Sequence, residues 1–169
     1  MEKFRVTEEL LASQGQRFLN FILDYIIRLG LLFCLSFIIA LIFVFFGFDG
    51  ILDFFENLDK FEEIILGLIS ILVYYVIMET FFSRTIAKYI TGTIVVMKDG
   101  SKPNFEVILK RTLCRIIPFD GLSFFGTPSR GWHDTMSNTY VVRKTDFEAK
   151  ITLFYEFDEI GKKPEPPID

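Results

Sequence analysis

The longest uninterrupted apolar stretch of the chain covers residues 29–48 (LGLLFCLSFIIALIFVFFGF) and contains no charged residue. As a helix, these residues would extend about 30 Å, which matches the hydrocarbon core of a bilayer. A cleaved signal peptide is the alternative, but its apolar region is shorter, and no small-residue cleavage site follows before Asp49. The stretch therefore predicts a transmembrane helix.

A second apolar stretch covers residues 64–82 (IILGLISILVYYVIMETFF) and is interrupted only by Glu79. It would extend about 28 Å as a helix, again close to the thickness of the hydrocarbon core. With their polar ends included, we predict transmembrane helices at about residues 13–48 and 62–83. Glu79 then needs an explanation, because it lies near one end of the second helix.

Charge is distributed unevenly around these two helices. The segment between them carries one base, Lys60, whereas the other 17 of the 18 Lys and Arg residues lie before residue 29 or after residue 82. The same segment holds six acids: Asp49, Asp53, Glu56, Asp59, Glu62 and Glu63. By the positive-inside rule, both termini lie in the cytoplasm and a short acidic loop lies outside.

Composition supports the membrane class. Of the 169 residues, 51% are hydrophobic and 17% are aromatic, with 21 Phe, and the mean hydropathy is +0.39, more apolar surface than the core of a soluble domain needs. We predict one membrane domain at residues 1–143 and a cytoplasmic extension at 144–169 that is flexible at its end. Cys34 and Cys114 lie in different environments, so no disulfide is expected.

A polar stripe begins before the first apolar stretch. Its members recur at spacings of 4, 3, 4 and 4 residues, and they are Ser13, Arg17, Asn20, Asp24 and Arg28. This spacing puts them on one helical face, which must face protein or water, and it allows Asp24 and Arg28 to pair. Ionisable residues in a membrane helix are candidate functional sites, yet near the boundary they also serve as structural ion pairs. Both interpretations stay open for these residues and Glu79.

The second half of the chain predicts smaller elements. Residues 93–97 (TIVVM) are β-branched and are followed by a turn signal, which indicates a strand. Residues 104–117 form a predicted basic amphipathic helix on the inner leaflet, where Lys110, Arg111 and Arg115 would contact anionic lipid headgroups. Residues 138–143 and 151–157 also have strand character. The predicted fold is thus a mainly α membrane protein with a small β element.

Residues 116–126 are too short to span a bilayer and would form a re-entrant or interfacial segment, followed by Trp132, a residue typical of the headgroup level. His133 and Asp134 are adjacent, but the chain has a single histidine and no metal-ligand spacing. No metal or cofactor is expected. Phosphate-binding loops, nucleophile motifs and catalytic Cys and His arrangements are also missing, so we expect neither an enzyme nor a nucleic-acid partner.

Several segments together resemble the RDD family of bacterial membrane proteins, named for an arginine and two aspartates. Arg17 and Asp24 in QRFLNFILDYI match the arginine and the first aspartate, and Asp134 in GWHDTMSNTYVV matches the second. The second helix ends in METFFSRTIAKYITGTIVVMKDGSKP, which is similar to the family's segment of a Glu, Thr-x-Gly-Lys and an apolar strand followed by Asp-Gly, although Ala87 replaces the usual glycine of Thr-x-Gly-Lys. The segment around residues 119–125 is much shorter than the third membrane helix of many members.

The resemblance implies a location in the bacterial cytoplasmic (inner) membrane, and a few family members are linked to sodium or proton exchange. One hypothesis is an accessory, scaffold or docking subunit that binds another membrane protein, or a second copy, through its cytoplasmic face. The alternative is an oligomeric cation or proton transporter that uses Asp24 and Glu79, oligomeric because two helices cannot enclose a path. Binding of a lipid where the helices meet the basic segment is compatible with the first hypothesis.

Overall fold

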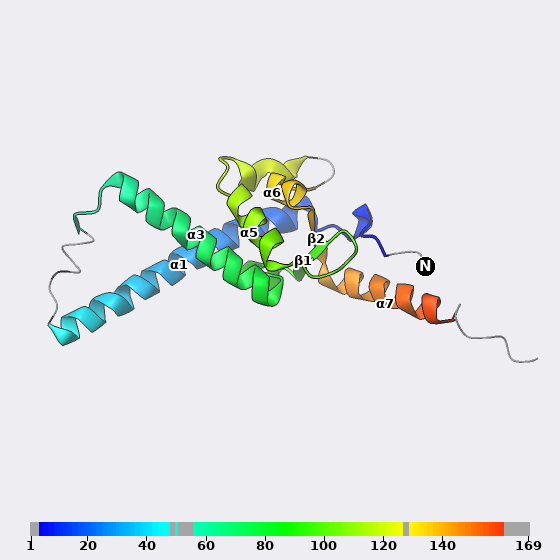
Figure 1. The fold of residues 1–169 in the computed structure, drawn as a ribbon, viewed down its shortest axis with the longest axis horizontal. Helices are drawn as coiled ribbons and strands as arrows, with labels where there is room; N and C mark the ends of the chain where they lie inside the picture. The colour runs from blue at the N-terminus through cyan, green and yellow to red at the C-terminus, as the bar shows by residue number, and fades with distance from the viewer. Residues whose placement is uncertain (1–3, 48–49, 51–55, 127–128, 161–169) are drawn as a thin grey trace, which may run out of the picture.

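Two long helices dominate the molecule, a computed structural model that describes residues 4–47, 50, 56–126 and 129–160 (Figure 1). Helix α1 (Gln14–Phe46) begins with a capping box, in which Ser13 and Gln16 satisfy each other's backbone N–H groups. Helix α3 (Lys60–Phe82) begins with the same device, built from Asp59 and Glu62. The two predicted helices are confirmed, except that residue 48 and the loop acids Asp49 and Asp53 lie outside the described residues.

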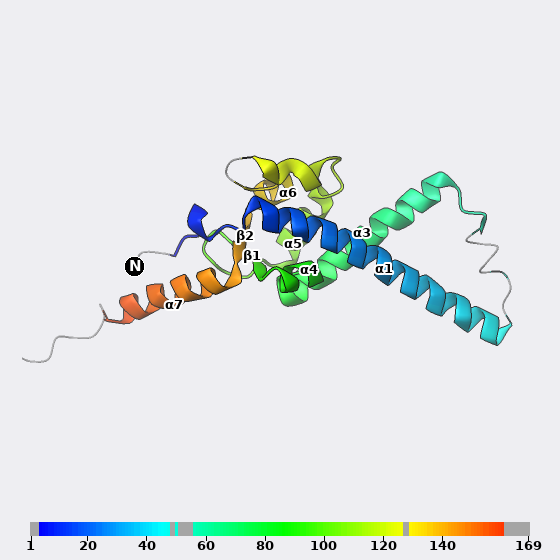
Figure 2. The same cartoon turned by 180° about the vertical axis from the view of Figure 1, so that it is seen from behind.

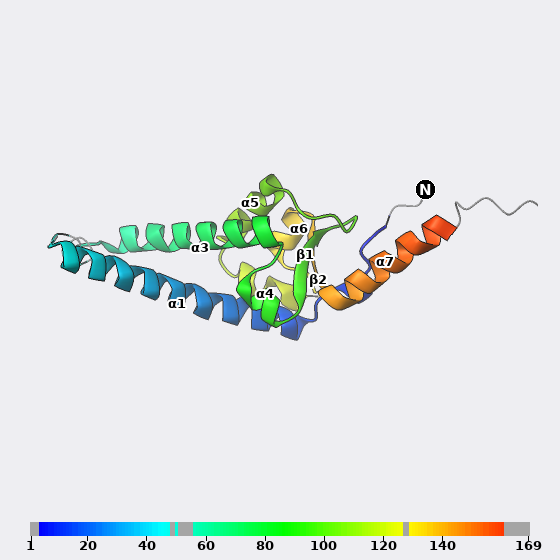
Figure 3. The same ribbon diagram turned by 90° about the horizontal axis from the view of Figure 1, so that it is seen from below.

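Both helices are long and apolar enough to cross a membrane. In the most apolar 18-residue window, none of α1 and 11% of α3 is buried by the rest of the protein. A core helix of a soluble protein would instead be largely covered. The two helices cross near the other elements and separate toward their far ends, as opposite views show (Figures 1 and 2). In the view from below they run side by side (Figure 3).

Residues 83–143 form a unit at one end of the two helices, here called the head. It contains α4 (Ile86–Ile90), β1 (Thr93–Met97), α5 (Phe105–Cys114), the 3-10 helix η2 (Asp120–Phe125), α6 (Trp132–Met136) and β2 (Thr139–Arg143). The strands pair antiparallel, with Thr93 opposite Arg143 and Met97 opposite Thr139. The strands predicted at residues 93–97 and 138–143 are therefore confirmed, the second beginning one residue later.

The N-terminal segment, including the 3-10 turn η1 (Glu8–Leu10), lies along the two strands. The Ala12 N–H donates to the Val141 carbonyl at 2.9 Å, and Leu11 forms a bridge with Val142. On the other side, the Val95 N–H donates to the Ser83 carbonyl at 2.9 Å. Both outer edges of the two-stranded ribbon are thus hydrogen-bonded to the chain itself.

Apolar side chains pack on both faces of this ribbon, because successive strand residues point to opposite sides. One face buries Val95 and Val141 with Ala12. The other face carries a larger cluster, formed by Phe4, Leu10, Val96, Val142 and Phe147. The second cluster attaches the N-terminal segment and the last helix to the head.

The strand predicted at residues 151–157 is wrong: this segment lies in α7 (Lys144–Ile160), a helix that projects away from the long helices (Figure 1). The alternation in ITLFYEF is typical of a strand, but a helical spacing of apolar residues starts earlier. Phe147, Ile151 and Phe154 are four and three residues apart, which puts them on one helical face. Phe4 contacts both Phe147 and Phe154 edge to face, at ring-centroid distances of 5.9 and 5.6 Å.

The predicted segment at 116–126 forms no third long helix. Its backbone turns sharply at Phe119, whose φ of 68° is left-handed, and then continues as η2 against α1. Phe124 of η2 is buried, whereas Phe119, Leu122 and Phe125 stay exposed. The segment therefore covers part of α1 while presenting an apolar outer edge.

Candidate functional site

Three of the five residues in the polar stripe of α1 face the head. Arg17, Asn20 and Asp24 are each at most 5% exposed although they belong to a helix whose other side chains are largely open. Asn20 donates to the Thr93 hydroxyl at 3.0 Å and accepts from the Thr91 hydroxyl at 2.6 Å. The stripe exists because these positions must satisfy polar groups of the head, which burial makes costly to leave unpaired.

Asp134, from α6, is fully buried between two arginines. Arg17 of α1 pairs with its Oδ2 at 2.5 Å, and Arg111 of α5 pairs with its Oδ1. Burial by itself would raise the pKa of the Asp134 carboxyl, but Arg111, Arg17 and His133 together hold that pKa well below its usual range. Asp134 therefore links α1, α5 and α6 as a carboxylate.

Glu79, from α3, is the centre of a second set of ion pairs. Its Oε1 accepts from Lys88 Nζ at 3.1 Å and from Arg115 Nη2 at 2.9 Å, and its Oε2 accepts from Arg111 Nε at 3.0 Å. Arg115 also stacks over the Tyr75 ring at 3.9 Å. Arg111 thus bridges the two acids, Glu79 and Asp134, and joins α3 to α6.

Asp24 is held mainly by neutral donors. The Tyr74 hydroxyl donates to Oδ1 at 2.8 Å, the Thr85 hydroxyl donates to Oδ2 at 2.7 Å, and the Ala87 N–H approaches Oδ1 at 3.4 Å. Lys88 Nζ lies 3.8 Å from Oδ2. Burial lowers the pKa of Lys88, and the carboxylates of Glu79 and Asp24 oppose that effect.

These groups form one connected set, here called the charge network: Arg17, Asp24, Glu79, Lys88, Arg111, Arg115 and Asp134. It contains four bases and three acids, so its formal charge is 4 − 3 = +1. Burying such charges costs several kcal/mol each, and their attraction offsets this only when the geometry is good. Removing one member therefore leaves a costly unpaired charge. The network joins both long helices to the head.

Two expectations about these charges are wrong. Arg111 and Arg115 were expected to contact lipid headgroups from the exposed surface of α5, but Arg111 is 0% exposed and both pair with buried carboxylates; Lys110 alone of the three is exposed. The amphipathic pattern of α5 does not reveal the buried acids of other helices that attract these two arginines. The expected pairing of Asp24 with Arg28 is also wrong: the Arg28 guanidinium instead donates to the Ser70 hydroxyl at 2.9 Å.

His133 lies beside the network. Its Nδ1 is 2.5 Å from Asp120 Oδ2, its backbone N–H donates to Asp120 Oδ1 at 2.9 Å, and its Nε2 is 3.6 Å from Asp134. Burial lowers the pKa of His133 despite these two carboxylates, because Arg111 and Arg115 act in the same direction as burial. Among the described residues, no group of three or more His, Cys, Asp or Glu side chains is arranged to hold a metal ion.

A cavity of about 290 Å³ lies between the long helices and the head. Phe21, Tyr25, Ile71 and Tyr75 of the long helices line one part of it. Asn20, Gly121, Phe124, His133 and Val141 also line it. The charged side chains of the lining are Arg17, Asp24, Arg28, Lys88, Arg111, Arg115 and Asp120. The site is thus amphipathic, with aromatic rings and guanidinium groups in one space.

Tyr74, Thr85 and Lys88 also belong to the site, although no sequence pattern singled them out. Thr85 and Lys88 lie in TIAKY, the segment quoted for the family resemblance, so the signal was present without a role. Thr85 caps α4, since its hydroxyl accepts from the Lys88 N–H at 3.4 Å, and this cap directs the lysine toward Glu79. Tyr74 gave no signal, because a tyrosine in an apolar helix is common.

Comparison with known families bears on these residues. The model of the RDD family matches residues 11–147, well over half of the chain. The chain belongs to the RDD family. The earlier resemblance is thereby confirmed, and the arginine and two aspartates quoted for it, Arg17, Asp24 and Asp134, all lie in the charge network of this RDD protein. Comparison with curated proteins and with solved structures gave no match.

Proposed function

We propose that this RDD protein is a small integral protein of the bacterial cytoplasmic membrane that acts as an accessory or docking subunit for another membrane protein. The observation that carries the proposal is the charge network. Its carboxylates are buried and paired, and they hold α1 and α3 to the head as one structure. A network of this kind stabilises the head as a surface to which another protein can bind.

The proposed orientation has both termini and the head in the cytoplasm. It is supported by the acids that precede α3 and by the bases of the head and the N-terminal segment. It also leaves the two apolar halves of α1 and α3, which carry no charge between residues 29 and 47 or between 64 and 78, to the hydrocarbon.

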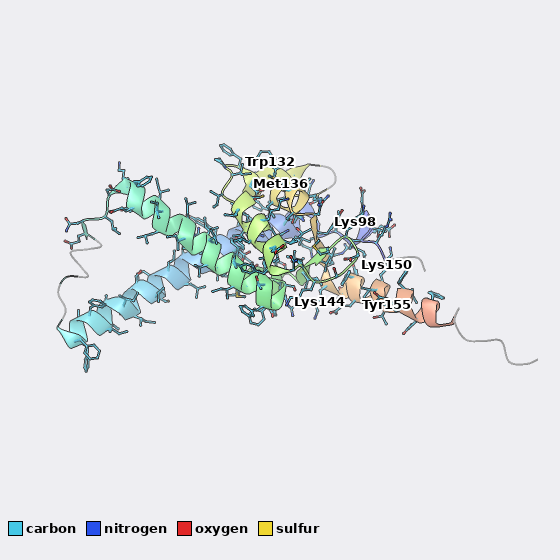
Figure 4. All side chains as sticks on the ribbon, viewed as in Figure 1. Lys98, Trp132, Met136, Lys144, Lys150 and Tyr155 are labelled. Atoms are coloured by element: carbon cyan, nitrogen blue, oxygen red, sulfur yellow. The ribbon has the colours of Figure 1, made fainter. Side chains whose placement is uncertain are left out.

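The outer edge of the head is proposed to rest in the inner-leaflet interface. Its exposed apolar side chains are Phe119, Leu122, Phe125, Trp132 and Met136. Figure 4 shows Trp132 and Met136 on the outer side of the head, away from Lys98, Lys144 and Lys150 near α7. A tryptophan beside a membrane helix is typical of contact with the headgroup region, and the other four side chains add apolar surface around it.

Trp132 is the single tryptophan of the chain, so its fluorescence tests this placement directly. In vesicles of phospholipids brominated at shallow or deep acyl positions, we expect the shallow bromines to quench Trp132 more strongly. If neither set of brominated lipids quenched Trp132, the placement of the head in the membrane interface would be contradicted.

The docking role is tested by capture of a tagged full-length protein, cross-linked in its native membrane before solubilisation. We expect Asp134→Asn to lower abundance and to lose the captured partner, because Arg17 and Arg111 lose their common carboxylate. Glu106→Gln, on the exposed surface of α5, is the matched control and should keep both. If Asp134→Asn stayed abundant and partner-bound but lost an ion flux, the docking role would be wrong. Recovery of the chain itself as the captured protein would identify self-association.

A cation or proton transporter, oligomeric and using Asp24 and Glu79, is the second candidate, supported by the presence of one buried carboxylate on each long helix. Purified protein in liposomes loaded with a pH-sensitive dye tests it. Transport predicts a pH change driven by a sodium or potassium gradient and its loss in Asp24→Asn. Absence of any flux from wild-type protein of verified fold and orientation would exclude this function.

A further inference from the structure

Three arginines that line the cavity between the long helices and the head have unused hydrogen-bond donors. Four buried guanidinium nitrogens have no partner among the described residues: Nε and Nη2 of Arg17, Nη2 of Arg111 and Nη1 of Arg115. All three arginines line the cavity. Buried donors without acceptors are costly, and the cost is larger for charged groups. An acceptor in this space would remove that cost.

The charge of the lining indicates what kind of acceptor fits. Five bases line the cavity, Arg17, Arg28, Lys88, Arg111 and Arg115, against two acids, Asp24 and Asp120. Their formal charge is 5 − 2 = +3. It falls to 3 − 2 = +1, which is still positive, when the nearby carboxylates of Glu79 and Asp134 are included. A cation is therefore disfavoured, and an anion is favoured.

From this juxtaposition we propose that the cavity binds a phosphate group, carried by a lipid headgroup or present as free phosphate. Guanidinium groups suit phosphate because their planar N–H donors form charge-assisted hydrogen bonds with its oxygens. Asp24 does not compete for these donors, since Tyr74, Thr85 and Lys88 surround its carboxylate.

The size and the apolar part of the cavity narrow the ligand further. A volume of about 290 Å³ is at the lower end of ligand sites in proteins, which suits a headgroup and leaves no room for a whole lipid. Phe21, Tyr25, Ile71 and Tyr75 lie on the helices that cross the membrane and would meet the first carbons of an acyl chain. Basic pockets between such helices on the cytoplasmic side are known to take anionic headgroups.

The proposal is independent of docking and is tested on delipidated full-length protein in a phosphate-free, uncharged detergent. The probes are phosphatidylglycerol in mixed micelles and inorganic phosphate at constant ionic strength, with thermal stabilisation and native mass spectrometry as readouts. We expect saturable binding that stabilises the wild-type protein. Binding of phosphatidylglycerol alone identifies a lipid headgroup as the ligand, and binding of inorganic phosphate as well shows that the phosphate group suffices.

The deciding variants alter the cavity without breaking the charge network. Arg28→Gln removes a lining charge that forms no ion pair among the described residues, and Arg115→Lys keeps the charge beside Glu79 but loses the unpartnered nitrogen. Each should raise the apparent Kd at least tenfold. Lys110→Gln, an exposed base on the surface of α5, should change it less than twofold.

Two results would overturn the proposal. One is the lack of saturable binding of either probe to folded wild-type protein. The other is an equal loss of binding in Lys110→Gln and Arg28→Gln, which would indicate nonspecific surface attraction. Should Arg115→Lys fail to fold, Arg28→Gln decides the matter by itself.

Discussion

The two ends of α1 differ more from each other than α1 differs from α3. In its far half, residues 29–46, the helix carries no charge and its large side chains are open, Phe33 at 73% and Phe45 at 82% exposure. In its near half, residues 14–28, which adjoin the head, Arg17 and Asp24 are buried against the head. A lipid environment accepts any apolar side chain of suitable length, whereas a buried charge accepts only a partner at the correct distance. The far half therefore secures location, and the near half specifies the fold.

The largest effect should come from the shared carboxylate of the charge network. Asp134→Asn leaves Arg17 buried without a charged partner and leaves Arg111 with Glu79 alone, so we expect the free energy of unfolding to fall by about 3–5 kcal/mol. Reversible unfolding in mixed micelles measures it, with Glu106→Gln as the exposed control. A loss under 1 kcal/mol would mean that the near half is no more specific than a surface ion pair, and the contrast between the two halves would disappear.

A smaller loss is expected where Asp24 depends on neutral donors. Tyr74→Phe removes the hydroxyl that donates to Oδ1 at 2.8 Å and should cost about 1–3 kcal/mol, the usual cost of an unsatisfied buried acceptor. Tyr155→Phe, on the exposed surface of α7, is the matched control. Equal stability of the two variants would show that Asp24 finds another donor.

Acidification should weaken the head through His133. The pKa of this histidine is lower in the folded protein than in the unfolded chain. As the pH falls through about 6.5, the unfolded chain therefore binds a proton at His133 while the folded protein remains unprotonated there. Stability is then complete above that pH and decreases as the pH falls below it. The groups facing the ring are Asp120, Asp134, Arg111 and Arg115. Thermal midpoints from pH 8 to pH 5, followed by Trp132 fluorescence, should fall in the wild-type protein.

His133→Gln separates this effect from other acid effects, because the chain has one histidine. The variant should lose the dependence between pH 7 and pH 5 while keeping the loss at lower pH, where Asp134 takes up a proton. Its carboxyl has a lowered pKa in the folded state, so its contribution is present above the normal aspartate pKa and disappears in strong acid. A wild-type midpoint that does not change down to pH 5 would contradict the assignment.

The smallest effect is expected in the far half of α1. Leu35→Ala and Ile38→Ala alter side chains that are 54% and 52% exposed and should change the free energy of unfolding by less than about 0.5 kcal/mol. Ile108→Ala in the head, at 0% exposure, should cost about 2–5 kcal/mol. If the far-half variants cost as much as Ile108→Ala, α1 would have a specific partner there.

Much of the fold is predictable because it depends on local patterns. The length of an apolar stretch decides the two long helices, and the β-branched residues at 93–97 decide a strand. Residues 151–157 were predicted wrongly for a similar reason. Their alternation resembles a strand, whereas the partner that selects a helix, Phe4, lies at the other end of the chain.

The site is only partly predictable because its contacts are long-range. The stripe of α1 and the family resemblance identified Arg17, Asp24 and Asp134, but the ion pair between Arg17 and Asp134 joins residues 117 positions apart. The burial of Arg111 depends on acids from two other helices, and no local property of α5 separates it from exposed Lys110. Charged residues need the fold before their roles can be assigned.

The ribbon of β1 and β2 limits how a partner can bind. Unpaired strand edges are common sites where another chain adds a strand, and they are also sites of aggregation. Here Ala12 closes the edge at Val141, and Ser83 closes the opposite edge at Val95. A partner of the proposed kind would therefore find no free backbone ladder at these positions and would have to recognise the side chains of the head, so single surface substitutions should be enough to alter that recognition.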